Sequence, residues 1–238
     1  MNPEQPVALV TGARKGIGRF LAEHLLKQGY RVFGCSRKPA DWSSEGVTHF
    51  ECDVTNEPQV KAMLRSVSQE TGGRLDVLLN NAGAASMNHV LLMPIESVNK
   101  MMGTNVLGTW LVSREAAKLM QKRRSGRIVN FSSIAVPMRL SGQAVYAASK
   151  GAVESLSQVM AREVAEFGIT VNVVGPTPIA TDMTRGVPQE TMDKLVAQFP
   201  IKRLGTMEEV ANVVDFFLRS ESSAITGQVI YLGGVPNG

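Results

Sequence analysis

Short runs of apolar, often β-branched residues alternate with longer helical patterns along the chain, and this alternation limits the possible folds more than any other feature. Between the runs, apolar residues recur at helical spacing, as at Ile17, Leu21 and Leu25. Near-continuous apolar strands separated by helices are typical of a parallel sheet that helices cover on both faces. The expected strands are residues 7–10, 31–35, 47–52, 75–79, 127–131, 169–174 and 228–232.

We therefore predict an α/β fold with one doubly wound, mostly parallel sheet, in a single domain that spans residues 1–238. A chain of 238 residues can bury one sizeable core, and no repeats, low-complexity stretches or Pro/Gly/Ser-rich linkers divide it. In such a fold the ligand lies beyond the carboxyl ends of the strands, where the strand order switches. Residues 175–205 interrupt the alternation with four prolines and a short helical pattern at 190–199, which is typical of a substrate loop.

The composition is that of an ordinary globular protein, with 44% hydrophobic and 19% charged residues. No apolar stretch is long enough to span a membrane, and the first residues lack the charged and apolar regions of a signal peptide. The two cysteines, Cys35 and Cys52, cannot form a disulfide framework, so we expect small buried side chains near strand ends. These features predict a cytoplasmic protein without a membrane partner.

The formal net charge of +4 is mild, but basic residues are concentrated between positions 114 and 127. A basic run can mark a nucleic-acid surface, whereas cations at a helix end also complement the negative end of the helix dipole. We favour the helix end and predict no nucleic-acid partner. His24 is expected in a helix and His49 in a strand, and neither they nor His89 have metal-ligand spacing with the cysteines. We therefore predict no metal site.

A glycine loop follows the first expected strand. Gly12, Gly16 and Gly18 stand where this strand gives way to a helix, with Ile17 between the last two. Glycines at such a place allow a tight turn, a close approach of the backbone to a pyrophosphate, and close packing of helix on strand. The spacing is G-x-x-x-G-x-G, which differs from the general dinucleotide fingerprint G-x-G-x-x-G. The loop still predicts a dinucleotide site.

The end of the second expected strand indicates which dinucleotide binds. An acidic residue at this place would bind the ribose hydroxyls of NAD, but the chain has Ser36, Arg37 and Lys38 there. An anion would meet Arg37 together with Arg14 and Lys15 of the glycine loop. Guanidinium groups suit a 2′-phosphate because they offer paired donors in a rigid fork. The alternative is that these are ordinary surface charges; the pattern favours NADP(H) as the cofactor.

Two further turns follow expected strands and are predicted to contact the cofactor. Asn81, Ala82 and Gly83 form a polar turn after the fourth strand, which suits an approach to a ligand but also suits any turn. Asp53, with Val54, follows the third strand. The Asp53 carboxylate could accept a hydrogen bond from an adenine amino group, or it could cap the next helix.

Four residues are predicted to carry the proton chemistry of a carbonyl reduction. Tyr146 and Lys150 stand four residues apart, on one helical face. An unperturbed phenol titrates near pH 10, and a neighbouring cation favours its ionised form, so Lys150 would help Tyr146 to exchange protons. Ser133 could hydrogen-bond a substrate oxygen, and Asn105 could orient water as a proton relay.

Taken together, these residues resemble the short-chain dehydrogenase/reductase family over essentially the whole chain. The resemblance implies a Rossmann fold with a seven-stranded sheet, an Asn105–Ser133–Tyr146–Lys150 tetrad and a homotetramer. It also implies that Tyr146, Lys150 and Pro176 contact the cofactor, whose amide is held by Ile179 and Thr181. The matching segments are T-G-x-x-x-G-I-G at 11–18, N-N-A-G at 80–83, N-V-x-G at 105–108, Y-x-x-x-K at 146–150, V-V-G-P at 173–176 and T-D-M at 181–183.

Within this family the chain is most similar to the 3-oxoacyl-[acyl-carrier-protein] reductases of fatty acid biosynthesis. The similarity lies in Arg124 and in the stretches 161–165 and 170–173. In those reductases two basic residues near the entrance grip the acidic carrier protein. Arg124 matches the first, but the second position holds Phe167, preceded by Glu166, and a carboxylate there is unfavourable for an acidic partner. Acyl carrier protein therefore remains an open partner.

The resulting prediction is an enzyme that reduces a carbonyl to an alcohol with NADPH, with a 3-oxoacyl thioester as the expected substrate. A free ketone, sugar, steroid or secondary metabolite is the alternative substrate. A non-catalytic NADP-binding regulator is the alternative from another class, and it would keep the fold while losing the tetrad.

Overall fold

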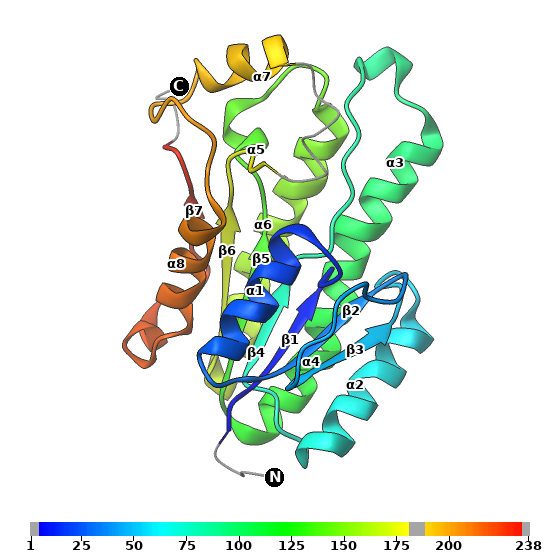
Figure 1. Cartoon of the computed structure of the whole chain (residues 1–238), viewed down its shortest axis with the longest axis vertical. Helices are drawn as coiled ribbons and strands as arrows, with labels where there is room; N and C mark the ends of the chain where they lie inside the picture. Colours follow the sequence, from blue (N-terminus) through cyan, green and yellow to red (C-terminus); the bar gives the residue numbers. More distant parts are fainter. Residues whose placement is uncertain (1–4, 181–188, 235–238) are drawn as a thin grey trace.

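The computed structural model describes residues 5–180 and 189–234 and contains a seven-stranded parallel sheet between two layers of helices (Figure 1). The strand order is β3-β2-β1-β4-β5-β6-β7. The predicted doubly wound α/β class is confirmed. The strands are β1 (Val7–Thr11), β2 (Arg31–Ser36), β3 (Val47–Glu51), β4 (Val77–Asn80), β5 (Gly126–Phe131), β6 (Ile169–Gly175) and β7 (Val229–Tyr231). The α-helices are α1 (Gly16–Lys27), α2 (Glu57–Thr71), α3 (Ile95–Met101), α4 (Thr109–Arg123), α5 (Ala135–Met138), α6 (Ala144–Val164), α7 (Gln189–Val196) and α8 (Met207–Leu218).

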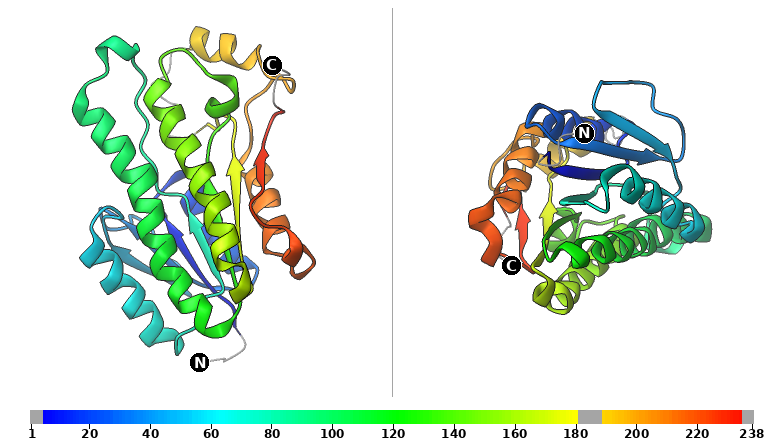
Figure 2. Two further views of the ribbon diagram at one scale, coloured as in Figure 1. Left: turned by 180° about the vertical axis from the view of Figure 1, so that it is seen from behind. Right: turned by 90° about the horizontal axis from the view of Figure 1, so that it is seen from below.

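Both faces of the sheet are covered, which explains why the strands are apolar at consecutive positions. In β1, Val7 and Leu9 belong to the core on the face of α2, α4 and α6, whereas Ala8 and Val10 belong to the core on the face of α1 and α8. Figure 2 shows the first of these helix layers from behind and the sheet end-on between the two layers. Successive side chains of a strand point to opposite faces, so each strand contributes residues to both cores.

The strand order places the ligand crevice at β1 and β4. The chain runs outward from β1 through β2 to β3, and then returns to build β4 to β7 on the other side of β1. Connections that leave in opposite directions from neighbouring strands open a crevice at their carboxyl ends. The glycine loop after β1 and the Asn81–Gly83 turn after β4 both lie at this edge.

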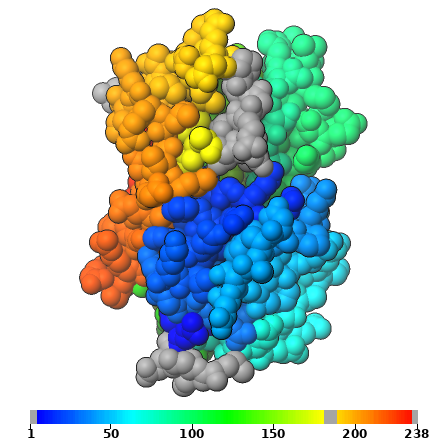
Figure 3. Space-filling view, in the orientation of Figure 1, coloured from blue at the N-terminus to red at the C-terminus, as the bar shows by residue number. Residues whose placement is uncertain are grey.

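Residues 175–205 interrupt the alternation of strands and helices, as expected, in the part of the region that the structure describes. The helical pattern expected at 190–199 is α7, and Ile179 forms a parallel bridge with Gly205, whose N–H donates to the Pro178 carbonyl at 3.1 Å. Positions 181–188, including Thr181, lie outside the described residues. Figure 3 shows the blue N-terminal segments directly below the yellow and orange stretch around α7 on one face of the molecule. The substrate role of this region stays a prediction.

The cysteines, two of the histidines and the basic run can also be located in the structure. Cys35 and Cys52 are free and buried at the ends of β2 and β3, and His24 and His49 lie in α1 and β3, as predicted. Within the basic run, the Arg114 guanidinium pairs with Glu57 at 2.7 Å and with the neighbouring Glu115 at 2.8 Å. No helix among the described residues is long and apolar enough to cross a membrane.

Candidate active site

The glycine loop is built around the turn that follows β4. Gly12 has a φ of +68°, and a Cβ at this position would lie 2.8 Å from the Asn81 Nδ2 atom. Asn81 Nδ2 donates to the Thr11 carbonyl at 3.0 Å, and the Ala82 N–H donates to the Thr11 hydroxyl at 3.0 Å. These bonds fix the two turns against each other, and only glycine fits both the backbone angle and the space.

The N-terminus of α1 opens toward the same crevice. This helix begins at Gly16, no side chain caps it, and its first turn contains no acidic residue. The first N–H groups of a helix have no partner within the helix, and the helix dipole adds a partial positive charge there. This helix end can therefore bind a pyrophosphate.

A cavity of about 630 Å³ connects the glycine loop, the ends of β2 and β3 and the turn after β4. Its size falls within the range of small-molecule sites, roughly 300–1,000 Å³. It is lined by Gly12, Arg14, Lys15, Gly16, Ile17, Cys35, Ser36, Arg37, Lys38, Cys52, Asp53, Val54, Asn81, Ala82, Gly83 and Thr104.

Most of the predicted cofactor contacts lie in this lining, but some do not. Gly18 lies beneath the loop, where any side chain would collide with Asn81 and the Gly12 carbonyl. Tyr146, Lys150, Pro176 and Ile179 are also outside the lining. Thr104 was not predicted; it immediately precedes Asn105, but no local pattern distinguishes it as a wall of the cavity.

The basic end of the cavity fits an anion. The Arg14 Nη2 atom is 3.3 Å from the Asp41 carboxylate, but the Arg14 Nε–H is buried without a hydrogen-bond partner among the described residues. A buried unsatisfied donor costs free energy, and a phosphate oxygen would satisfy it. Trp42 holds the loop in place, because its indole N–H donates to the carbonyls of Ala13 and Arg14 at 3.1 and 3.0 Å.

The opposite wall contains Asp53, whose two alternative roles the structure separates. The cap of α2 is Asn56, whose side chain accepts from the Gln59 N–H at 3.1 Å. Asp53 Oδ1 instead accepts from the N–H and the hydroxyl of Thr55 at 2.9 and 2.8 Å. The helix-cap alternative for Asp53 is therefore wrong, whereas its contact with an adenine stays a prediction.

Lys150 is buried beside the catalytic tyrosine predicted from the sequence. Its side chain is 5% exposed, and Nζ donates to the Phe131 carbonyl at the end of β5 at 2.8 Å. Burial lowers the pKa of Lys150 to about 8, because the charged form loses water. The Nζ atom lies 6.0 Å from the centre of the Tyr146 ring. Lys150 and Tyr146 thus lie side by side at the end of β5.

Tyr146 itself responds mainly to burial. Burial raises the pKa of the phenol above its usual 10.0, and a hydrogen bond with Ser133 lowers it by less. The lowering of this pKa that the sequence led us to expect from Lys150 is not seen; the group that lowers it is Ser133, and burial dominates. A phenol that keeps its proton at neutral pH is suited to donate it to a developing alkoxide.

Asn105 lies in a π-helical segment, Met102–Gly108, between α3 and α4. Its amide nitrogen donates to the Ala84 carbonyl and to the Ser149 hydroxyl, both at 2.9 Å, and its Oδ1 accepts from the Ala84 N–H at 2.8 Å. Ser149 in turn donates to the Tyr146 carbonyl at 2.7 Å. Asn105 therefore connects the turn after β4 to the helix of the tyrosine. Both hydrogens of the Asn105 amide are already donated, so a relay water would have to donate to an oxygen atom of Asn105.

Ser133 follows the end of β5, and its hydroxyl accepts from the Ala135 N–H at 3.2 Å. The residue before it, Ser132, donates from its hydroxyl to Glu154, which also accepts from the Tyr231 hydroxyl at 2.6 Å. Glu154 lies one helical turn beyond Lys150 in α6. No sequence pattern pointed to this carboxylate, since only the folded chain brings it to Ser132 and to β7.

Comparisons with known proteins agree with this geometry. A family model described as enoyl-(acyl carrier protein) reductase matches residues 12–234. The chain is 38% identical to the 3-oxoacyl-[acyl-carrier-protein] reductase FabG of Vibrio cholerae and 37% identical to that of Escherichia coli, each over 98% of both chains.

Solved structures are also similar to this chain over nearly its whole length. Aldohexose dehydrogenase of Thermoplasma acidophilum has a TM-score of 0.90 and 31% identity, covering 100% of this chain and 98% of that one. ElxO with NADP bound has a TM-score of 0.88 and 34% identity, covering 96% of this chain and 97% of that one. The fold, the tetrad geometry and these relatives lead to one conclusion: the chain belongs to the short-chain dehydrogenase/reductase family of oxidoreductases.

Proposed function

We propose that this chain is an NADPH-dependent reductase that converts a 3-oxoacyl thioester to the 3-hydroxyacyl thioester. The observation that carries the proposal is the position of Tyr146, which is hydrogen-bonded to Ser133 and lies 6.0 Å from the charged group of Lys150. The turn after β4 links this cluster to the dinucleotide-sized cavity, since a Cβ at Gly83 would lie 3.6 Å from Lys150 Nζ.

The residues of the site have separate tasks in this reaction. When bound, the reduced nicotinamide supplies a hydride to the carbonyl carbon. Ser133 hydrogen-bonds the carbonyl oxygen and orients it toward Tyr146. As negative charge develops on that oxygen, Tyr146 transfers its phenolic proton to it, and the product is the neutral alcohol. Lys150 stabilises the phenolate that remains, because a positive charge nearby favours the ionised form.

The choice of NADPH rests on the basic end of the cavity. Arg14, Lys15, Arg37 and Lys38 line it, and the buried Arg14 Nε–H needs an acceptor. No carboxylate among the lining residues lies at the end of β2, where a ribose-binding acid would stand. ElxO, a solved relative, binds NADP, which supports the same assignment.

The thioester substrate is supported by the FabG relatives, which are named for 3-oxoacyl-[acyl-carrier-protein] reduction. The surface near α6 gives weaker support for a carrier protein, because only one of the two expected cations is present there. Arg124, the one matching cation, donates from Nη2 to the Glu166 carbonyl at 2.5 Å, and Phe167 packs against the core. A free carbonyl compound is the second candidate, favoured by this incomplete clamp and by the likeness to an aldohexose dehydrogenase.

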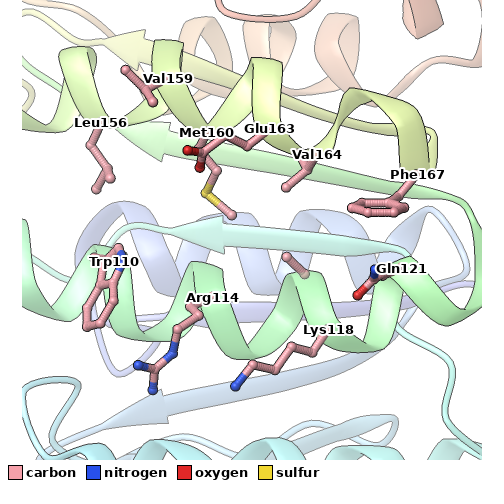
Figure 4. A pocket seen from close by; sticks show the side chains of 11 residues that line it. Trp110, Arg114, Lys118, Gln121, Leu156, Val159, Met160, Glu163, Val164 and Phe167 are labelled. Carbon is pink, nitrogen blue, oxygen red and sulfur yellow. The ribbon is translucent and has the colours of Figure 1, made fainter.

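A homotetramer is part of the proposal. Three apolar side chains are exposed here: Leu107 of the π-helical segment is 44% exposed, Trp110 of α4 is 39% exposed, and Val159 of α6 is 54% exposed. A pocket of about 220 Å³ lies between the two helices; it is lined by Trp110 and Arg114 of α4, by Val159 of α6 and by Phe167 beyond the end of α6 (Figure 4). A second copy of the chain would cover these apolar side chains, and Phe216 on α8 offers a second contact for a tetramer. The buried free cysteines fit a cytoplasmic location.

The experiment is a comparison of substrates, with NADPH consumption followed by absorbance. Acetoacetyl-CoA, a carrier-protein-linked 3-oxoacyl thioester and a panel of free ketones and aldoses are compared at equal concentration. We expect turnover of the thioesters at a much higher kcat/KM than of any free carbonyl compound. Turnover of free compounds alone would contradict the thioester assignment while leaving the carbonyl-reductase assignment intact.

A further inference from the structure

His49 lies under the basic end of the cavity, although it is not part of the lining. In the sheet it stands beside Gly34, and both residues point to the same face. A Cβ at Gly34 would lie 3.0 Å from His49 Nδ1 and 2.9 Å from the Ala13 Cβ. The absent side chain of Gly34 therefore makes the space in which the imidazole reaches past β2 toward Ser36.

The hydrogen bonds of Ser36 determine which ring nitrogen of His49 carries the proton. Ser36 Oγ is 2.7 Å from the Lys38 carbonyl and 2.7 Å from His49 Nε2. A carbonyl only accepts, so the single hydroxyl proton is donated to Lys38, and His49 must donate from Nε2 to the same hydroxyl oxygen. The opposite tautomer would put two acceptors at 2.7 Å and leave an N–H on Nδ1 unsatisfied.

The remaining atoms of the ring agree with this assignment. His49 Nδ1 is buried and has no hydrogen-bond partner among the described residues, which a neutral acceptor nitrogen tolerates better than an N–H would. Burial also lowers the pKa of His49 below 6.5, so the ring is neutral at physiological pH and has one N–H to give.

This chain of hydrogen bonds ends at the turn that carries Arg37 and Lys38. The Ser36 hydroxyl donates its hydrogen bond to the Lys38 carbonyl. Ser36 therefore closes the turn that carries Arg37 and Lys38, and its hydroxyl has no proton left to donate to a ligand. Both basic side chains line the cavity. We propose that His49 is a positioning residue for NADPH selectivity: through Ser36 it holds the turn on which Arg37 and Lys38 meet the 2′-phosphate. The inference rests on the proposed cofactor but not on the proposed substrate.

The test measures the binding of cofactor fragments, which requires no turnover. Affinities for adenosine 2′,5′-diphosphate and for adenosine 5′-monophosphate are measured by calorimetry on the full chain, before and after His49→Phe. The phenyl ring keeps most of the volume and removes the N–H. We expect the bisphosphate to bind about fivefold more weakly, as befits the loss of one supporting hydrogen bond, while the monophosphate is unaffected.

Three further variants make the result specific. His49→Gln keeps an N–H donor and should recover at least half of the lost preference. Ser36→Ala should reproduce the loss, and His49→Phe should add nothing in that background, because the two residues act in one chain. His24→Phe is the matched control: this histidine contacts Asp215 between α1 and α8, and neither ligand should change in affinity.

The outcomes separate the two proposals. Equal weakening of both ligands by His49→Phe would mean that the histidine only supports the fold, and no change would mean that it does nothing for binding; either result overturns the inference. Additive losses in the double variant would also overturn it. If the unsubstituted chain showed no preference for the bisphosphate, the NADPH assignment itself would fail and the role of His49 with it.

Discussion

At the scale of single residues, burial shifts the two proton-handling groups in opposite directions. It raises the pKa of Tyr146 above 10.0 and lowers the pKa of Lys150 to about 8. At neutral pH the phenol therefore keeps its proton while most of the lysine stays charged. Reduction requires this combination, because Tyr146 must have a proton to give and Lys150 a charge to stabilise what remains.

We predict that reduction slows as the pH rises through about 8. Below this pKa Lys150 is charged, and above it the ammonium loses the charge that supports the phenolate. The kcat/KM for NADPH-dependent reduction, measured between about pH 6 and about pH 10, should be level on the acid side and fall by up to about tenfold per pH unit on the alkaline side. In Lys150→Arg the guanidinium stays charged, so any remaining activity should lack this decline. A level profile through the whole range in the unsubstituted enzyme would contradict the role of Lys150.

At the scale of elements, one face of α6 ties the end of β5 to the edge of the sheet. Lys150 binds the Phe131 carbonyl in β5, and Glu154, one turn later, binds both Ser132 and Tyr231 of β7. Ser132 also donates its N–H to the Val174 carbonyl in β6 at 2.8 Å. The position of Ser133 is thus set through the two residues before it, Phe131 and Ser132, as well as by its own contacts.

Tyr231→Phe should lower the free energy of unfolding by about 1–2 kcal/mol, because a hydrogen bond to a carboxylate is lost. Urea denaturation measures this change, and Glu154→Gln, which keeps an acceptor for both hydroxyls, should cost less. The affinity for NADPH should stay the same in both variants, since neither residue lines the cavity. An unchanged unfolding midpoint for Tyr231→Phe would show that the Glu154 contact contributes nothing.

These elements also show what the sequence could predict and what it could not. The central strands β1, β2, β4, β5 and β6 followed from their apolar runs because they are buried on both faces, and α1 followed from apolar residues at helical spacing. Contacts between distant elements depend on the strand order, so the pairing of Glu154 with Tyr231 and of His49 with Ser36 had no local signal. No sequence pattern indicated that Asn105 lies in a π-helical segment, because periodicity does not distinguish one inserted residue.

At the level of the whole molecule, α4 and α6 expose apolar side chains around the pocket between them. Trp110 and Val159 are two of these side chains, and the Arg114 guanidinium lies 4.6 Å from the centre of the Trp110 ring. Monomeric proteins seldom expose large contiguous apolar patches, and in oligomers a twofold axis brings identical patches together.

Trp110→Glu should therefore halve the assembly by mass, from a tetramer to a dimer, because it places a carboxylate in an apolar interface. Light scattering after size-exclusion chromatography measures the mass directly. Lys38→Glu is the matched control, since it adds a carboxylate on an exposed loop after β2, outside α4 and α6, and should leave the mass unchanged. A Trp110→Glu variant of unchanged mass would place the interface elsewhere.

The most direct test of the whole account is Tyr146→Phe, which removes one hydroxyl and keeps the ring. NADPH consumption with acetoacetyl-CoA and NADPH affinity by fluorescence titration are measured side by side on the same preparation. We predict that kcat falls by at least about a hundredfold, as for the loss of a general acid, while the dissociation constant for NADPH stays within about twofold. Turnover that persisted at the original rate would contradict the central claim that Tyr146 donates the proton.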